Sequence, residues 1–184
     1  MQREPDVIIG SFAADHVITD DKVFQAAVNE AIEVAATGKI VTIGLRPTEA
    51  SVAFGYIHRG EKLDSPSACQ VREFVEKPNI RLAQKYVSSG EYFWNAGMFI
   101  APASLLLEVL AQTQPELHAG VMELSRVWDT ADRAATLSAI WPTLQQIAID
   151  YAIAEPAANQ GLVAVVPGEF ESVSYTHLTL PTNR

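Results

Sequence analysis

The chain has 184 residues and a formal net charge of −9, with 48% hydrophobic and 19% charged side chains. This composition is typical of a globular protein with one sizeable core, so a single domain is expected. The negative charge argues against nucleic-acid binding, which needs clustered Lys and Arg, and no run of about eighteen apolar residues suggests a membrane span. Because the N-terminus lacks the apolar core of a signal peptide and Cys69 is the only cysteine, we expect a cytoplasmic protein without an internal disulfide.

The first predicted elements are a strand, a helix and a second strand. Residues 7–11 have the pattern of a short buried strand, and Asp15 follows its carboxyl end, where open α/β sheets bind ligands. Apolar residues recur at helical spacing over 23–35, and Gly38 ends that helix. A β-branched run over 40–45 predicts the next strand, so we expect a β-α-β unit with two parallel strands.

The middle of the chain alternates predicted strands with predicted helices. The strands are expected at 54–57, 70–76 and 96–101, and the helices at 79–88 and 102–113. Asn79 is a suitable N-cap for the first of these helices, and Gly90 lies just past its end.

The last third of the chain is predicted to be mostly helical over 115–155, with a break at Trp141-Pro142 and a final strand at 162–166. No internal repeat or low-complexity linker divides the sequence, so we expect one domain over 1–171. The order of elements predicts an α/β fold, a mostly parallel sheet with helices on both sides.

Two short motifs near the middle of the chain carry chemically informative residues. Residues 74–78 read Phe-Val-Glu-Lys-Pro, and residues 92–99 read Tyr-Phe-Trp-Asn-Ala-Gly-Met-Phe. The hydroxyl groups of a sugar need a carboxylate that accepts hydrogen bonds and an amide that donates and accepts them, which Glu76 and Asn95 supply. A phosphate needs an ammonium group, which Lys77 supplies. The motifs therefore favour a site for a sugar phosphate.

These motifs resemble those of the mannose-1-phosphate guanylyltransferases, which make GDP-mannose and pyrophosphate from GTP and mannose 1-phosphate. The Trp-Asn-x-Gly-Met-Phe form is typical of that family, whereas Glu-Lys-Pro also resembles related glucose-1-phosphate enzymes. The resemblance extends roughly from Pro5 to Glu171. Further matching segments lie at 14–18, 54–57, 149–152 and 166–170.

The resemblance implies an incomplete Rossmann-like nucleotidyltransferase domain of the GT-A-like kind. It implies that Glu76 and Asn95 orient the mannose, while Lys77 binds the phosphate and takes part in catalysis. It also implies that Asp15 is catalytic as a ligand of Mg²⁺. Without the family, the residue pattern favours an ordinary loop aspartate after a strand over a metal ligand at Asp15.

Three further residues are implied to bind substrate. Gly55 and Gly97 lack a Cβ atom, which would let the sugar ring approach the backbone closely, although Gly55 is also consistent with an ordinary strand irregularity. Asp150 lies in a helix-like segment, where a helix cap or an internal ion pair is as plausible as a substrate contact. Both interpretations of Asp150 stay open at this point.

Two motifs of the resembled family do not occur in this sequence. One is a Gly-rich segment similar to Gly-x-Gly-Thr-Arg-x-x-Pro that holds the nucleoside triphosphate, and the other is Trp-x-Asp-Val-Gly, whose aspartate is a metal ligand. We therefore expect the chain by itself to have no measurable guanylyltransferase activity. Residues 172–184 are rich in Ser and Thr, depart from the family pattern, and are expected to be a non-native or disordered tail.

Other functions remain open from the sequence. The chain could belong to an enzyme that acts on another hexose 1-phosphate, or to a noncatalytic regulatory protein that binds a sugar phosphate. The nucleobase preference and the oligomeric state, including a possible homo-oligomer, are not determined by these motifs.

Overall fold

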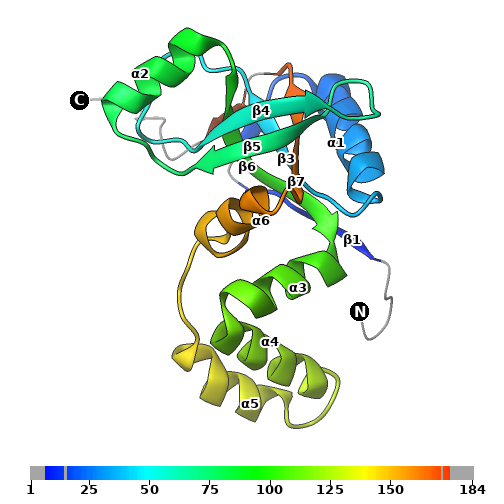
Figure 1. Ribbon diagram of the computed structural model, residues 1–184. Coiled ribbons are helices and arrows are strands. Elements are labelled where there is room, and N and C mark those ends of the chain that lie inside the picture. Colours follow the sequence, from blue (N-terminus) through cyan, green and yellow to red (C-terminus); the bar gives the residue numbers. More distant parts are fainter. Residues whose placement is uncertain (1–6, 15, 171, 175–184) are drawn as a thin grey trace, which may run out of the picture.

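The computed structural model describes residues 7–14, 16–170 and 172–174 (Figure 1). In this part of the chain a six-stranded sheet has the order β1-β6-β3-β7-β5-β4, and a separate two-stranded sheet contains β2 and β8. The strands are β1 (Ile8–Ser11), β2 (His16–Ile18), β3 (Ile40–Leu45), β4 (Tyr56–Lys62), β5 (Cys69–Val75), β6 (Tyr92–Pro102), β7 (Val163–Gly168) and β8 (Ser172–Ser174).

The helices agree closely with the sequence predictions. They are α1 (Asp21–Ala35), α2 (Ile80–Ser89), α3 (Ala103–Thr113), α4 (Pro115–Val127), α5 (Arg133–Ile140), α6 (Glu155–Asn159), and the short helices η1 (Trp141–Thr143) and η2 (Asp150–Ala154). The caps of α2 are confirmed: Asn79 accepts a hydrogen bond from the backbone N–H of Leu82 at 3.1 Å, and Gly90 has a φ of 70°. The predicted break at Trp141-Pro142 is confirmed as η1.

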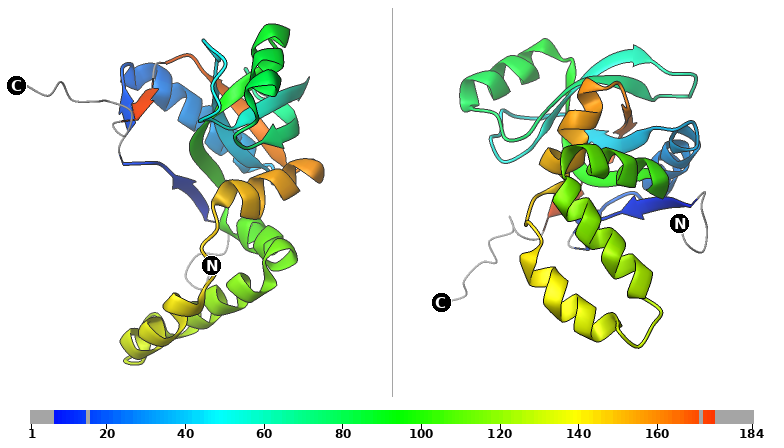
Figure 2. Two further views of the ribbon diagram at one scale, coloured as in Figure 1. Left: turned by 90° about the vertical axis from the view of Figure 1, so that its left-hand side faces the viewer. Right: turned by 60° about the horizontal axis from the view of Figure 1, so that its bottom comes forward.

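The α/β class with helices on both faces of the sheet is confirmed. Val41 and Ile43 of β3 pack in one core cluster with buried residues of α1, whereas Ile40 packs in a second cluster with Val109 of α3 and residues of η2 and α6. Figure 2 shows α1 and α6 on opposite sides of the sheet. Because both faces are covered, β3 and β7 can be apolar along their whole length.

The prediction of a mostly parallel sheet was wrong. Among the described strands of the large sheet, β3 and β7 form the one parallel pair, and the other pairings are antiparallel. The strands β1 and β3 run in the same direction as expected, but β6 lies between them and pairs antiparallel with both. Sequence periodicity identifies a strand, whereas the neighbour of that strand depends on contacts between distant segments.

Helices α3, α4 and α5 extend away from the sheet (Figure 1). Strand β8, at the start of the tail predicted over 172–184, pairs antiparallel with β2, and residues 175–184 lie outside the described part. None of the helices in the described part is long and apolar enough to cross a membrane.

Candidate functional site

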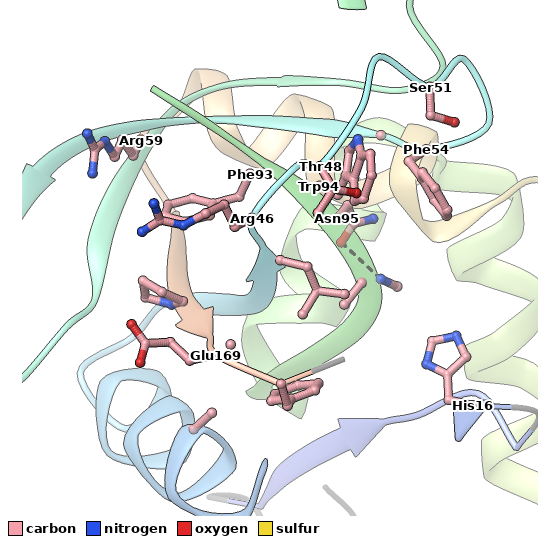
Figure 3. A pocket seen from close by; sticks show the side chains of 18 of the residues that line it. His16, Arg46, Thr48, Ser51, Phe54, Arg59, Phe93, Trp94, Asn95 and Glu169 are labelled. Atoms are coloured by element: carbon pink, nitrogen blue, oxygen red, sulfur yellow. Dashed lines mark hydrogen bonds between the residues drawn. The ribbon is translucent and has the colours of Figure 1, made fainter. Parts of the chain in front are cut away.

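A large cavity opens at the carboxyl ends of β3 and β7, the parallel pair of the sheet. Its volume is about 1480 Å³, and its walls come from the end of β3, the following loop, the middle of β6, the end of β7 and helix α1. Figure 3 shows Arg46, Arg59 and Glu169 on one side of it, Ser51 and Phe54 on the other, and Asn95 between them. Ligands of open α/β sheets bind at this position because the strand ends and their loops converge there.

Glu76 and Lys77 follow directly after the last residue of β5, as predicted. The Lys77 Nζ atom lies 2.6 Å from the Glu76 Oε1 atom, and the side chains are 58% and 8% exposed, respectively. The hydrogen bond with Glu76 and its negative charge raise the pKa of Lys77 above its usual value. The Glu76 carboxylate therefore lines the cavity, while the exposed ammonium group of Lys77 lies beside this carboxylate and is accessible to a second anion.

The backbone at Lys77 is unusual. Its φ is 47°, and it is the one non-glycine residue of the described part with a positive φ. Such a conformation costs on the order of 1 to 3 kcal/mol and is concentrated at functional sites. The turn brings the two charged side chains to the same edge of the cavity.

Asn95 is the centre of a hydrogen-bond network in the cavity. Its Oδ1 atom accepts hydrogen bonds from Thr42 Oγ1 at 2.8 Å and from the backbone N–H of Gly97 at 3.1 Å. Its Nδ2 atom donates to Asp150 Oδ1 at 2.8 Å. Its backbone N–H donates to the carbonyl oxygen of Gly55 at 2.8 Å. The network brings residues predicted from separate segments into one cluster.

Asp150 belongs to this cluster, because its side chain accepts a hydrogen bond from Asn95. It begins the π-helix η2, a helix type that is frequent at functional sites. Burial raises the pKa of Asp150, and the negative charge of Glu76 raises it further. Two carboxylates that interact in a partly buried cavity are well suited to accept hydrogen bonds from several sugar hydroxyl groups. A direct contact between Asp150 and substrate stays a prediction.

The two predicted glycines serve different purposes in the structure. A Cβ atom at Gly55 would overlap the Glu76 Oε2 atom, so glycine is needed there to make room for the carboxylate. Gly97 has a φ of 68°, and a Cβ atom there would have no described protein atom within 4 Å. Glycine at position 97 therefore allows the backbone conformation in which its N–H donates a hydrogen bond to the Asn95 side chain. Close approach of a ring to either glycine stays a prediction.

The predicted metal ligand, Asp15, lies outside the described residues. Within the described part, no group of three or more His, Cys, Asp or Glu side chains could hold a metal ion. The carboxylates of Glu76 and Asp150 each use one oxygen for Lys77 or Asn95. The described residues by themselves therefore do not form a metal site.

Several residues that line the cavity, or that contact residues lining it, were not found from the sequence. Thr42 carries the one hydroxyl group in the otherwise apolar run over 40–45, and this contrast is its only signal in the sequence. Tyr56 is buried, and its hydroxyl both accepts from the backbone N–H of Ser51 and donates to its carbonyl oxygen, each at 3.0 Å, which fixes the loop before Gly55. Arg46 and Arg59 carry no motif that would separate them from surface arginines.

Comparison with known proteins identifies the family of the chain. Residues 1–139 match the nucleotidyl transferase family, which is well over half of the chain. The chain belongs to the nucleotidyl transferase family. The substrates of this family are a sugar phosphate and a nucleoside triphosphate, and its members generally use a divalent metal ion. The resemblance seen in the sequence motifs is thereby confirmed.

Curated relatives of this nucleotidyl transferase are named mannose-1-phosphate guanylyltransferase. The protein from Escherichia coli K12 is 36% identical over 191 residues, which cover 95% of this chain and 37% of the relative. A protein from Salmonella typhimurium LT2 is 48% identical over 113 residues, which cover 61% of this chain and 23% of the relative. The chain thus spans well under half the length of these relatives.

Solved structures show the same fold. A Thermus thermophilus protein, described as a mannose-1-phosphate geranyltransferase, has a TM-score of 0.77 and 29% identity, covering 90% of this chain and 46% of that protein. A Helicobacter pylori protein described as a mannose-6-phosphate isomerase has a TM-score of 0.76 at 22% identity, covering 93% of this chain and 65% of that protein, which supports the fold alone.

Proposed function

We propose that this chain forms the sugar-phosphate site of a mannose-1-phosphate guanylyltransferase, which transfers GMP from GTP to mannose 1-phosphate. The products are GDP-mannose and pyrophosphate. The observation that carries the proposal is the cluster of Glu76, Lys77, Asn95 and Asp150 around Gly55 at one edge of the cavity. The names of the relatives supply the choice of mannose 1-phosphate and GTP within the family.

The polar groups of the cluster match the hydroxyl groups of a hexose. The carboxylates of Glu76 and Asp150 accept hydrogen bonds, and the Asn95 Nδ2 group donates them. A sugar hydroxyl donates one hydrogen bond and accepts others, so a single hydroxyl can satisfy Asn95 and a carboxylate together. The charge of the carboxylates makes such hydrogen bonds stronger than those between neutral groups.

Lys77 is placed to bind the phosphate of the sugar. Its ammonium group is held by Glu76 but more than half exposed, so a phosphate can approach it from solvent. In the reaction, a phosphate oxygen of mannose 1-phosphate attacks the α-phosphorus of GTP, and the bond from that phosphorus to pyrophosphate breaks. Because both substrates are anions, the protein acts by orienting them in line and by reducing their repulsion.

The volume of the cavity is consistent with two substrates. A space of about 1480 Å³ exceeds the roughly 300 to 1,000 Å³ of a typical small-molecule site. We propose Mg²⁺ as the divalent ion and Asp15 as a ligand for it, and we assign no step to the metal because the described residues form no metal site. A cytoplasmic location and a homo-oligomer also stay predictions.

A calorimetric titration of the purified chain tests the proposal. Mannose 1-phosphate should bind with a saturable signal. Mannose and inorganic phosphate should each bind more weakly, because mannose lacks the group that Lys77 binds and phosphate lacks the hydroxyl groups that the rest of the cluster binds. Asn95→Ala should weaken binding of mannose 1-phosphate. Glu108→Gln, a change on α3 outside the cavity, is the control and should bind normally. Equal binding of mannose 1-phosphate by the Asn95→Ala and control variants would contradict the proposal.

A further inference from the structure

Thr42 occupies an exceptional position in the core. Its exposure is 0%, so its hydroxyl has no access to solvent. It lies in the middle of β3 between the fully buried residues Val41 and Ile43. Its hydroxyl donates to the Oδ1 atom of Asn95 at 2.8 Å. A hydroxyl placed in an otherwise apolar strand thus reaches the centre of the candidate sugar site.

The partners of Asn95 determine which way its amide group faces. The backbone N–H of Gly97 can only donate, so the atom that it meets must be Oδ1. The Oδ1 atom of Asp150 accepts a hydrogen bond from Nδ2, which agrees with this direction. The Thr42 hydroxyl, which can do either, meets Oδ1 and therefore donates. The Gly97 N–H thus sets the direction of the amide, and the Thr42 hydroxyl holds it there by filling the remaining acceptor site of Oδ1.

In this orientation, groups of the protein itself occupy both acceptor sites of the Asn95 Oδ1 atom. Oδ1 receives two hydrogen bonds, from Thr42 and Gly97, and one Nδ2 hydrogen goes to Asp150. The second Nδ2 hydrogen has no partner among the described residues. Asn95 therefore offers a ligand one donor and no acceptor, in contrast to the donor and acceptor expected from its residue type.

We infer that Thr42 is a positioning residue that fixes the Asn95 amide as a hydrogen-bond donor toward the sugar. The inference rests on the proposed sugar-phosphate site. It assigns a selection rule to the site: the sugar group that faces Asn95 must accept a hydrogen bond. A hydroxyl or ether oxygen meets this rule, whereas the ammonium group of an amino sugar has no lone pair and is rejected.

The orientation can be tested without any ligand by NMR of the full chain. Thr42→Val keeps the shape of the side chain and removes the hydroxyl, and Thr42→Ser keeps the hydroxyl. We expect Thr42→Val to shift the Asn95 side-chain amide resonances and to speed their exchange with water. Thr42→Ser should leave them close to their wild-type values. Unchanged Asn95 resonances in folded Thr42→Val would overturn the inference.

A measurement on the wild-type chain covers the case in which Thr42→Val does not fold. The Thr42 hydroxyl proton should be observable, because burial and its hydrogen bond to Asn95 slow its exchange with water. Contacts from this proton to Asn95 are expected. A hydroxyl proton that exchanges freely, or that contacts only the apolar neighbours of β3, would overturn the inference.

Binding measurements connect the orientation to the ligand. Thr42→Val should weaken binding of mannose 1-phosphate about five- to tenfold, the effect of one hydrogen bond, and Thr42→Ser should restore most of it. Wild-type binding in both variants would also contradict the role of Thr42. If the wild-type chain does not bind mannose 1-phosphate, the proposed function fails, while the NMR result still decides whether Thr42 orients Asn95.

Discussion

Replacing Gly55 by alanine should separate ligand binding from folding. The added Cβ atom would overlap the Glu76 Oε2 atom, and its next neighbours are Asn95 Cβ at 3.4 Å and Phe74 Cε1 at 3.6 Å. The overlapping atom is the end of a flexible side chain, so the carboxylate can move away while the strands stay in place. The backbone of Gly55 is not in the left-handed region, so alanine introduces no backbone strain.

The expected effect follows from these contacts. A glycine-to-alanine change without backbone strain stabilises a protein by about 0.4 to 1 kcal/mol, which offsets part of the cost of moving the Glu76 carboxylate. Displacing Glu76 removes a charged hydrogen bond to the sugar, worth about 1.5 to 3 kcal/mol. Calorimetry should therefore show mannose 1-phosphate binding that is about 10- to 150-fold weaker, with little change in the free energy of unfolding.

Gly90→Ala is the matched control for this prediction. Gly90 has a φ of 70°, and a Cβ atom there would have no described neighbour within 4 Å, so alanine is strained but meets no other group. It should lower the free energy of unfolding by about 1 to 2 kcal/mol and leave ligand binding unchanged. The reasoning is refuted if Gly55→Ala binds mannose 1-phosphate as tightly as the wild-type chain.

Three other changes test the remaining parts of the site. Glu76→Gln should weaken mannose 1-phosphate binding by about 2 kcal/mol in calorimetry, because a carboxylate acceptor becomes partly a donor; an unchanged affinity removes Glu76 from the site. Lys77→Met should weaken binding of mannose 1-phosphate but not of neutral mannose, and equal losses for both would exclude a phosphate contact. Burial, and next the Glu76 charge, raise the pKa of Asp150, so the folded chain holds this proton more tightly than the unfolded chain. Urea denaturation should therefore show that the free energy of unfolding falls as the pH rises from the unfolded-state pKa of Asp150 through its folded-state pKa. The Asp150→Asn variant should lack this part of the pH dependence.

Local sequence signals predicted much of the structure. The caps of α2 are set by Asn79 and Gly90, residues whose preferences act within one turn of helix. The end of β5 delivers Glu76 and Lys77 to the cavity, since a proline and a helix follow immediately. The sequence motifs also identified Asn95, although the strand predicted over 96–101 begins after it and β6 begins at Tyr92.

The remaining features depend on contacts between distant parts of the chain. The insertion of β6 between β1 and β3 could not be read from periodicity, because the pattern of a strand does not name its partner. The donor role of Asn95 depends on Thr42 and Asp150, which are 53 and 55 residues away in the sequence. The residue type of Asn95 therefore predicted that it makes hydrogen bonds in the site, whereas the direction of those bonds depends on its neighbours in the folded chain.

The most direct test of the site is an NMR titration of the isotope-labelled chain with mannose 1-phosphate. We expect saturable shifts of the backbone amides of Gly55, Glu76 and Gly97 and of the Asn95 side-chain amide. Helices α3 to α5 should show no saturable shifts, because none of their residues lines the cavity (Figure 1). Saturable shifts confined to those helices, or no saturable shift at all, would contradict a sugar-phosphate site at Glu76 and Asn95.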